Sequence, residues 1–393
     1  MLLLLKISNN SAKIKLLQRF RICFEMEFRS KKLLLSSFGK GIFMKRLAII
    51  TGILSGFLFG IATPFSKLLL AGLNSFQLAG LLYLGASLAM LPYIFRKNSN
   101  LKLLFQPGNR SKTIGIIFFG GFAGPLLLLA GLRIANAASV SIWLNMELVA
   151  TAILGVLIFK DALDRNTWIG VLLTIIAGIV VSFGEGTSGI ISGLLITAAC
   201  ICWGVDNHLT ALTDGASPQT VTFVKGIVAG SVNLIIGCII GCIIAGQPMI
   251  LSNVVPAILV GIFAYGFSIV LYVTSAQNIG ATRSQILFST APIWGVILSY
   301  LFVHEPFQWV HLISITLLAL AVIVTNLFSH KHRHTHVVME HIHYHNHADG
   351  HHNHMHEDET VSPGKWHSHL HTHEPITHEH PHDPDLHHRH GHE

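Results

Sequence analysis

A long apolar segment occurs twice in this chain at a fixed spacing of 144 residues. The first copy covers residues 137–183 and the second covers residues 281–327, and each has two apolar arms around a short polar break. The same shift also aligns residues near the start of each half. The aligned pairs include Gly60 with Gly204, Ala137 with Ala281, Ile142 with Ile286, Leu154 with Leu298, Asp161 with Glu305, and Ala177 with Ala321. One shift without insertions that aligns both ends of a half indicates an internal duplication.

Each arm has the length of about 20 residues that a helix needs to cross about 30 Å of hydrocarbon. Hydrophobic residues make up 51% of the chain and charged residues only 11%, which excludes an ordinary soluble domain. We therefore expect an all-α integral membrane protein. Ten spans are predicted, at residues 47–70, 76–95, 114–132, 137–159, 167–183, 188–206, 220–245, 254–274, 281–303 and 308–328.

The basic residues predict the orientation, because cytoplasmic loops are enriched in Lys and Arg. The segment before residue 47 is basic, and the second and fourth loops, expected in the cytoplasm, hold Arg96, Lys97, Lys102, Arg110, Lys112, Lys160 and Arg165. The fifth, seventh and ninth loops, expected outside, contain no Lys or Arg. We expect a multi-pass protein of the plasma (inner) membrane with both termini in the cytoplasm. This pattern accounts for the net charge of +7 without nucleic-acid binding.

Five spans in each half is an odd number, so the two halves, residues 44–183 and 187–328, must have opposite orientations. Inverted repeats are typical of secondary transporters, whose substrate site lies between the halves near the bilayer midplane. A metal-sensing receptor without transport remains an alternative, but a receptor has no need of the repeat. The sequence has no phosphate-binding glycine loop, nucleophile elbow or HExxH motif, so no enzyme is predicted.

Residues 1–43 have two interpretations. They form either a basic amphipathic segment on the membrane surface or sequence upstream of a start at Met44, which leads directly into the first span. The second interpretation predicts that a chain beginning at Met44 inserts normally.

Several short motifs in this framework resemble a known family. The first span ends in a small-residue turn and a lysine, from Phe59-Gly60 to Lys67, and its counterpart reads Cys202-Trp203-Gly204. A Ser-Pro pair at 217–218 opens the seventh span. Over residues 47–328 the chain resembles the EamA-type transporters of the drug/metabolite transporter superfamily.

The match is incomplete. The resemblance implies an Arg in the second helix of each half, where this chain has Leu81 and Lys225, and a Pro in each fourth helix, present as Pro292 but replaced by Leu148. It implies a membrane transporter and leaves the substrate open.

Ionisable residues inside a membrane span are costly and are therefore candidates for function. Glu147 lies near mid-depth of the fourth span, close to Asn145 and Trp143. We expect it either to bind and release the coupling proton in a central cavity or to hold helices together, with Lys225 as its counter-charge.

Further candidates for the cavity are Asn145, Trp143, Asp206, Trp203 and Trp294. The alternatives for these residues are a solvated cytoplasmic rim for Asp206 and anchoring at the lipid interface for the tryptophans.

After the last span the composition changes abruptly, and residues 330–393 contain all but three of the 26 histidines. Such a tail lacks a hydrophobic core and is expected to be disordered. Imidazole is a good ligand for Ni, Co, Zn and Cu, so the tail is predicted to bind these ions, although no cofactor is required. The predicted ligands are His341, His343, His345, His347, His351, His352, His354, His356, His367, His369, His371, His373, His378, His380, His382, His387, His388, His390 and His392.

Two functions remain open. The first is a proton-coupled transporter of a small organic metabolite, with the tail as a metal buffer or sensor. The second is a transporter of a divalent transition metal or its chelate, with the tail as an ion collector. The spans favour organic cargo because they hold no His or Cys cluster at mid-depth, whereas the tail favours metal. Besides the cargo, the expected partner is the lipid bilayer, and a homodimer is left open.

Overall fold

The computed structural model describes most of the chain between residues 47 and 327 and four short segments of the tail. The described residues are 47–96, 101–159, 165–213, 216–244, 249–279, 284, 287–327, 331–335, 339–345, 367–373 and 377–381. The predictions for residues 1–43, for the break at Lys160-Asp161 and for most tail histidines therefore lie outside the described residues.

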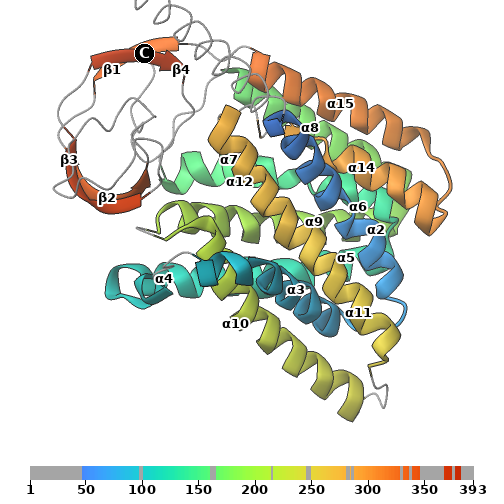
Figure 1. Ribbon diagram of the computed structural model, residues 1–393. Helices are drawn as coiled ribbons and strands as arrows, with labels where there is room; N and C mark the ends of the chain where they lie inside the picture. The colour runs from blue at the N-terminus through green and yellow to red at the C-terminus, as the bar shows by residue number, and fades with distance from the viewer. Residues whose placement is uncertain are drawn as a thin grey trace, which may run out of the picture.

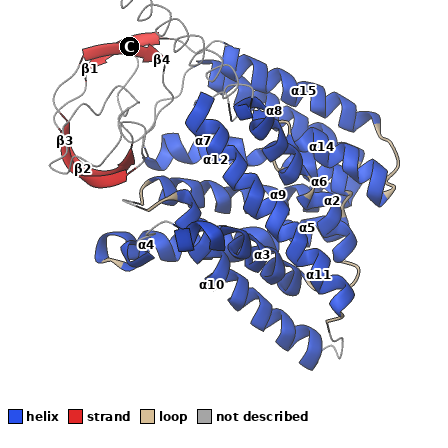
Figure 2. Cartoon of the chain, in the orientation of Figure 1, coloured by secondary structure: helices blue, strands red, loops and turns tan. Residues whose placement is uncertain are grey.

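Helices form the whole body of the protein (Figures 1 and 2). Among the described residues, eight helices are long and apolar enough to cross a bilayer: Leu47–Leu69, Ser75–Phe95, Pro107–Ile134, Ala137–Ile158, Arg165–Gly184, Gly186–Ala211, Pro218–Gly241 and Leu251–Ser275. Two shorter apolar helices follow at Ala291–Val303 and Trp309–Val324. The protein is thus a multi-pass, all-helical membrane protein. The helix Ala291–Val303 is shorter than the predicted span of residues 281–303 because a turn at residues 289–290 precedes it. The last helix continues to Leu327, close to the predicted end.

Several spans are made of more than one helical element. The α-helices are α2 (Ala62–Leu69), α3 (Ser75–Arg96), α4 (Pro107–Gly115), α5 (Gly124–Ile134), α6 (Ala137–Trp143), α7 (Met146–Leu154), α8 (Arg165–Gly184), α9 (Gly186–Ala211), α10 (Pro218–Cys238), α11 (Leu251–Val260), α12 (Ser268–Ile279), α14 (Ala291–Leu298) and α15 (Trp309–Leu327). A 3-10 helix, η2 (Leu101–Phe105), precedes α4. Short π-helices are η3 (Ile116–Ala123), η4 (Gly155–Phe159), η5 (Ile239–Ile244), η6 (Gly261–Phe267) and η7 (Ser299–Val303).

The outward surface of these helices is apolar. Leu157, Phe183 and Leu194 are 74%, 78% and 67% exposed, among many other large apolar side chains. In water such a surface would aggregate, whereas in a bilayer it contacts lipid chains that are equally apolar.

The duplication seen in the sequence is also a structural one. The π-helices η4 and η7 occupy positions separated by the same shift of 144 residues. Equivalent spans of the two halves pack on each other, through α3 and α10, through α6 and α14, and through α8 and α15. The cross-contacts are reciprocal too, since α3 packs on η6 and α10 packs on η3. Self-complementary packing of this kind is what a two-fold relation between two repeats produces.

The paired glycines Gly60 and Gly204 show the same reciprocity. A β-carbon at Gly60 would lie 2.7 Å from Cβ of Trp294 in α14, and one at Gly204 would lie 3.2 Å from the amide nitrogen of Thr151 in α7. Each glycine therefore lets the first helix of one repeat approach the fourth helix of the other. The lack of a side chain, rather than backbone flexibility, is the reason for glycine here.

Four strands are described in the His-rich tail: β1 (Lys331–Thr335), β2 (Met339–His345), β3 (His367–His373) and β4 (Thr377–Pro381). They form two antiparallel ribbons, β1 with β4 and β2 with β3. Most of the tail lies outside the described residues, so its disorder stays a prediction. The repeated His-x-His pattern has the two-residue period of a strand, which composition alone does not reveal.

Candidate transport site

The fourth helix of each repeat is interrupted near its middle. In the first repeat, a turn at Leu144 and Asn145 separates α6 from α7, and the amide N–H of Leu148 donates to the carbonyl of Asn145 (3.0 Å). In the second repeat, a turn at residues 289–290 precedes α14, whose first turn contains Pro292. The proline lacks an amide N–H and so favours a break there. Discontinuous helices of this kind often border substrate sites in transporters.

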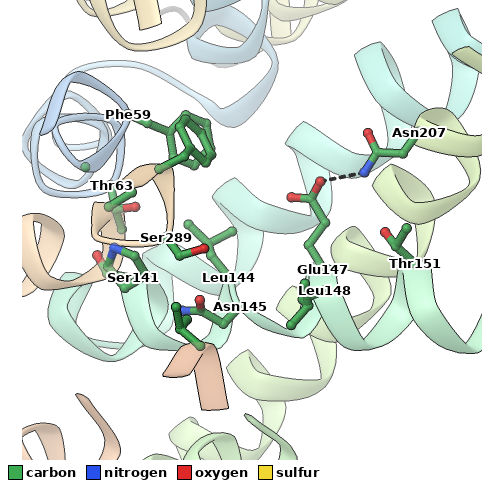
Figure 3. A pocket seen from close by; sticks show the side chains of 15 residues that line it. Phe59, Thr63, Ser141, Leu144, Asn145, Glu147, Leu148, Thr151, Asn207 and Ser289 are labelled. Carbon is green, nitrogen blue, oxygen red and sulfur yellow. Dashed lines mark hydrogen bonds between the residues drawn. The ribbon is translucent and has the colours of Figure 1, made fainter. Parts of the chain in front are cut away.

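The two breaks face a common cavity of about 350 Å³ (Figure 3). Its lining comes from the first helix, from both interrupted helices, and from α9 and α15. The lining residues are Phe59, Gly60, Thr63, Ser141, Leu144, Asn145, Glu147, Leu148, Thr151, Asn207, Phe288, Ser289, Ala291, Pro292 and Val322.

Glu147 is the charged residue in the lining of this cavity. It lies in the first turn of α7, directly after the break, and its Oε1 accepts a hydrogen bond from Nδ2 of Asn207 (2.8 Å; Figure 3). The mid-depth carboxylate predicted from sequence therefore borders an open space between the repeats.

A second cavity of about 420 Å³ adjoins the first and shares Phe59, Glu147, Asn207 and Phe288 with it. The remaining lining residues are Tyr83, Trp203, Asp206, Lys225, Tyr265, Ile269 and Tyr272. Aromatic and charged side chains thus dominate this cavity.

An ion pair closes one side of the second cavity. Nζ of Lys225 lies 2.6 Å from Oδ2 of Asp206, and both side chains are mostly buried, with 18% and 6% exposed. Asp206 fits against η3 because Gly120 has no side chain, and a β-carbon there would overlap the carboxylate. The predicted partnership of Lys225 with Glu147 is corrected accordingly, since the ammonium is bound by Asp206. Asp206 is also buried rather than part of a solvated rim.

The comparison with known families gives two matches, one in each repeat. The family model of the EamA-like transporter family matches residues 46–183 and again residues 190–327. The chain belongs to the EamA-like transporter family. Its members are transporters and not enzymes, in agreement with the absence of enzyme motifs from the sequence.

Two relatives with similar sequences are themselves described only as transporters, without a substrate. An uncharacterized transporter of Methanothermobacter thermautotrophicus is 26% identical over 291 residues, which cover 68% of this chain and 83% of that protein. The uncharacterized transporter YyaM of Bacillus subtilis is 25% identical over 258 residues, 62% of this chain and 81% of that protein. A solved crystal structure shares the fold at a TM-score of 0.51 and 16% identity, covering 71% of this chain and 97% of that one.

In this EamA-like transporter, most of the polar residues predicted from the sequence lie at the two cavities. Asn145 lines the first cavity, Trp203, Asp206 and Lys225 line the second, and Glu147 lines both. Sequence position alone did not show that these residues, which come from three different spans, meet in one place.

Two of the predicted tryptophans lie outside the lining of these cavities. Trp143 is buried in the core, where its Nε1 donates to the carbonyl of Gly178 (3.0 Å) and to Oγ of Ser182 (3.1 Å). Trp294 packs edge-on against Phe57, with ring centroids 5.3 Å apart. Trp143 sits on the face of α6 directed at α8, so its nearness to Glu147 in sequence does not bring it to the cavity.

A polar network around His311 was not predicted from the sequence. His311 is only 1% exposed, and its Nε2 lies 2.8 Å from Oγ of Ser139 while its Nδ1 lies 2.7 Å from the hydroxyl of Tyr300. Oγ of Ser139 also donates to the carboxylate of Glu185 (2.5 Å). The available signal was His311 itself, one of three histidines outside the tail and placed within an apolar span.

The described residues contain no group of three or more His, Cys, Asp or Glu side chains arranged to hold a metal ion. Of the predicted tail ligands, those in β2, β3 and β4 are described by their places in these strands. The others, including His347, His351, His352, His354, His356, His382, His387, His388, His390 and His392, lie outside the described residues.

Proposed function

We propose that this EamA-like protein is a secondary active transporter of a small organic metabolite and that Glu147 couples transport to protons. The observation that carries the proposal is the position of Glu147, which borders both cavities at the break of a discontinuous helix. A carboxylate in mainly apolar surroundings can bind a proton from one side of the membrane and release it on the other.

The proposal includes ten spans in two inverted five-helix repeats, with both termini in the cytoplasm. The reciprocal packing of equivalent spans supports it, because a two-fold relation between the halves would produce such packing. A reporter fused after residue 186 should lie outside the plasma membrane and one fused after residue 330 inside. Both reporters on the same side would contradict the inverted arrangement.

The coupling role is tested with purified protein in proteoliposomes. A pool of metabolites is supplied outside, a proton gradient is imposed, and uptake is followed by mass spectrometry. Glu147→Gln keeps the size of the side chain and its bond to Asn207 but cannot release a proton. Proton-driven accumulation should collapse, while exchange of internal for external substrate continues. Unchanged proton-driven accumulation in Glu147→Gln would refute the coupling role.

For the tail we propose binding of Ni, Co, Zn or Cu. The strand register supports it, because histidine stands opposite histidine at five positions: His332 with His380, His334 with His378, His341 with His371, His343 with His369, and His345 with His367. Residues opposite each other in antiparallel strands share one face of the ribbon. Paired histidine positions therefore recur along both ribbons.

Transport of a metal ion is the second candidate, favoured by the same paired histidines. Deletion of residues 330–393 separates the two candidates and removes no described helix of the membrane body. With organic cargo, transport in metal-free buffer should be unchanged. With metal cargo, transport at low ion concentration should weaken because the tail no longer raises the local ion concentration.

A further inference from the structure

We infer that the transported metabolite is an organic cation whose positively charged nitrogen lies against the aromatic wall of the second cavity, with Glu147 balancing its charge. This inference rests on the proposed function and names the substrate class of the same site. It follows from the aromatic side chains, from the net charge of the cavity, and from which polar groups are already engaged.

Five aromatic rings form a continuous row along the second cavity. Their ring centroids follow one another at 5.9 Å for Tyr83 and Tyr265, 6.1 Å for Tyr265 and Phe59, 5.2 Å for Phe59 and Phe288, and 5.3 Å for Phe288 and Tyr272. All five rings line the cavity, and they come from three membrane spans and from the segment just before α14. An aromatic ring has negative faces and a positive edge, and a cation over a ring face is attracted to it.

The charges that line the two cavities leave one carboxylate in excess. Lys225 and Asp206 neutralise each other at 2.6 Å, while the described partner of the Glu147 carboxylate is the neutral amide of Asn207. A ligand with one positive charge would compensate Glu147, whereas an anion would add a second negative charge to the cavity.

Three donors that could bind an anion, on Tyr83, Trp203 and Lys225, already have acceptors within the protein. The hydroxyl of Tyr83 (2.5 Å) and Nε1 of Trp203 (3.2 Å) both donate to the carbonyl of Gly120, and the ammonium of Lys225 donates to Asp206. An anionic ligand that took the donor of Tyr83 or Trp203 would break a buried bond and leave the carbonyl of Gly120 without that partner. A cation needs only the ring faces and the Glu147 carboxylate.

The volumes of about 350 and 420 Å³ limit the size of the ligand. They fit a small amine or quaternary ammonium compound, at the lower end of the range of about 300–1,000 Å³ for small-molecule sites.

The test is calorimetric binding to the full-length protein in detergent at fixed pH, with matched probes. The cationic probes are choline, tetramethylammonium, phenethylammonium and benzyltrimethylammonium. The neutral control is 3,3-dimethylbutan-1-ol, in which carbon replaces the nitrogen of choline, and the anionic control is benzoate. At least one cation should bind about tenfold or more tightly than the two controls, as cation–π and carboxylate contacts in a desolvated site predict. If no cation binds, or if the controls bind as well as the cations, the inference is wrong.

Variants then locate the binding site. Phe288→Leu removes a ring and should weaken binding of the tightest cation about 5- to 30-fold, whereas Phe288→Tyr keeps the ring and should weaken it less than about threefold. Phe118→Leu is the matched control, because Phe118 is 51% exposed and lines neither cavity. Equal affinities in Phe288→Leu and Phe118→Leu would overturn the placement.

The same set of proteins separates this inference from the proposed function. If Glu147→Gln abolishes proton-driven transport but cations bind no better than the controls, the coupling role stands and the substrate class is wrong. If cations bind selectively and Glu147→Gln still shows proton-driven transport, the substrate class stands and the coupling role is wrong.

Discussion

The carboxylate of Glu305 accepts a hydrogen bond of 2.6 Å from the backbone N–H of Ala137, 168 residues earlier in the chain. Its second oxygen accepts one from the N–H of Ala138 (2.9 Å). Glu305 belongs to the polar break of the second repeat, and Ala137 is the first residue of α6 in the first repeat. A residue of one half thus provides partners for the free N–H groups at the start of the interrupted helix of the other half.

This contact predicts a stability effect for Glu305. Glu305→Ala leaves two N–H groups without their charged acceptor and should lower the free energy of unfolding by about 1–3 kcal/mol. Thermal unfolding in detergent measures the change. Thr316→Ala serves as the control, because Thr316 is exposed, its described hydrogen bond goes to Leu312 in the same helix, and its loss should have little effect. A Glu305→Ala protein as stable as Thr316→Ala would contradict the cap.

The ion pair of Asp206 and Lys225 predicts a strongly non-additive double variant. Asp206→Asn or Lys225→Met alone leaves one charge in a mostly buried site and should cost about 3–5 kcal/mol. The double variant removes both charges and should be more stable than the sum of the single changes predicts. Chemical or thermal denaturation of the four proteins gives the coupling energy, and strict additivity would show that the two charges do not depend on each other.

Gly120 and Gly108 form a matched pair for steric tests. A β-carbon at Gly120 would overlap the carboxylate of Asp206, whereas one at Gly108 has no atom within 4 Å. Gly120→Ala should displace Asp206, reduce the yield of folded protein and abolish transport. Gly108→Ala should be neutral or slightly stabilising, since alanine favours a helix over glycine by about 1 kcal/mol. Normal folding and transport in Gly120→Ala would show that Asp206 can move away without consequence.

Substitution of Trp143 should change the stability of the protein but not its ligand preference. Trp143→Phe removes the donor to Gly178 and Ser182 and part of a buried ring, and should cost about 2–4 kcal/mol. Because Trp143 does not line either cavity, the remaining folded protein should bind ligands with unchanged relative affinities. Thermal unfolding and ligand titration check the two effects, and a changed ligand preference would place Trp143 in the site after all.

The sequence by itself determined the membrane class, the duplication and the candidate role of Glu147. Runs of about 20 apolar residues have no stable alternative to spanning a bilayer as helices. The shift of 144 residues also predicted which elements correspond, and the equivalent π-helices η4 and η7 follow it. A carboxylate in the middle of an apolar span stands out without any structure, because burying it is costly.

Only the tertiary structure decided which side chains meet. These helices are apolar on nearly all sides, so their periodicity does not show which face is turned to a cavity, to another helix or to lipid. For this reason Trp143 was expected at the cavity, Lys225 was assigned to Glu147, and the network around His311 was missed. The aromatic row from Tyr83 to Tyr272 joins residues from both repeats, and that proximity exists only once the two halves have packed together.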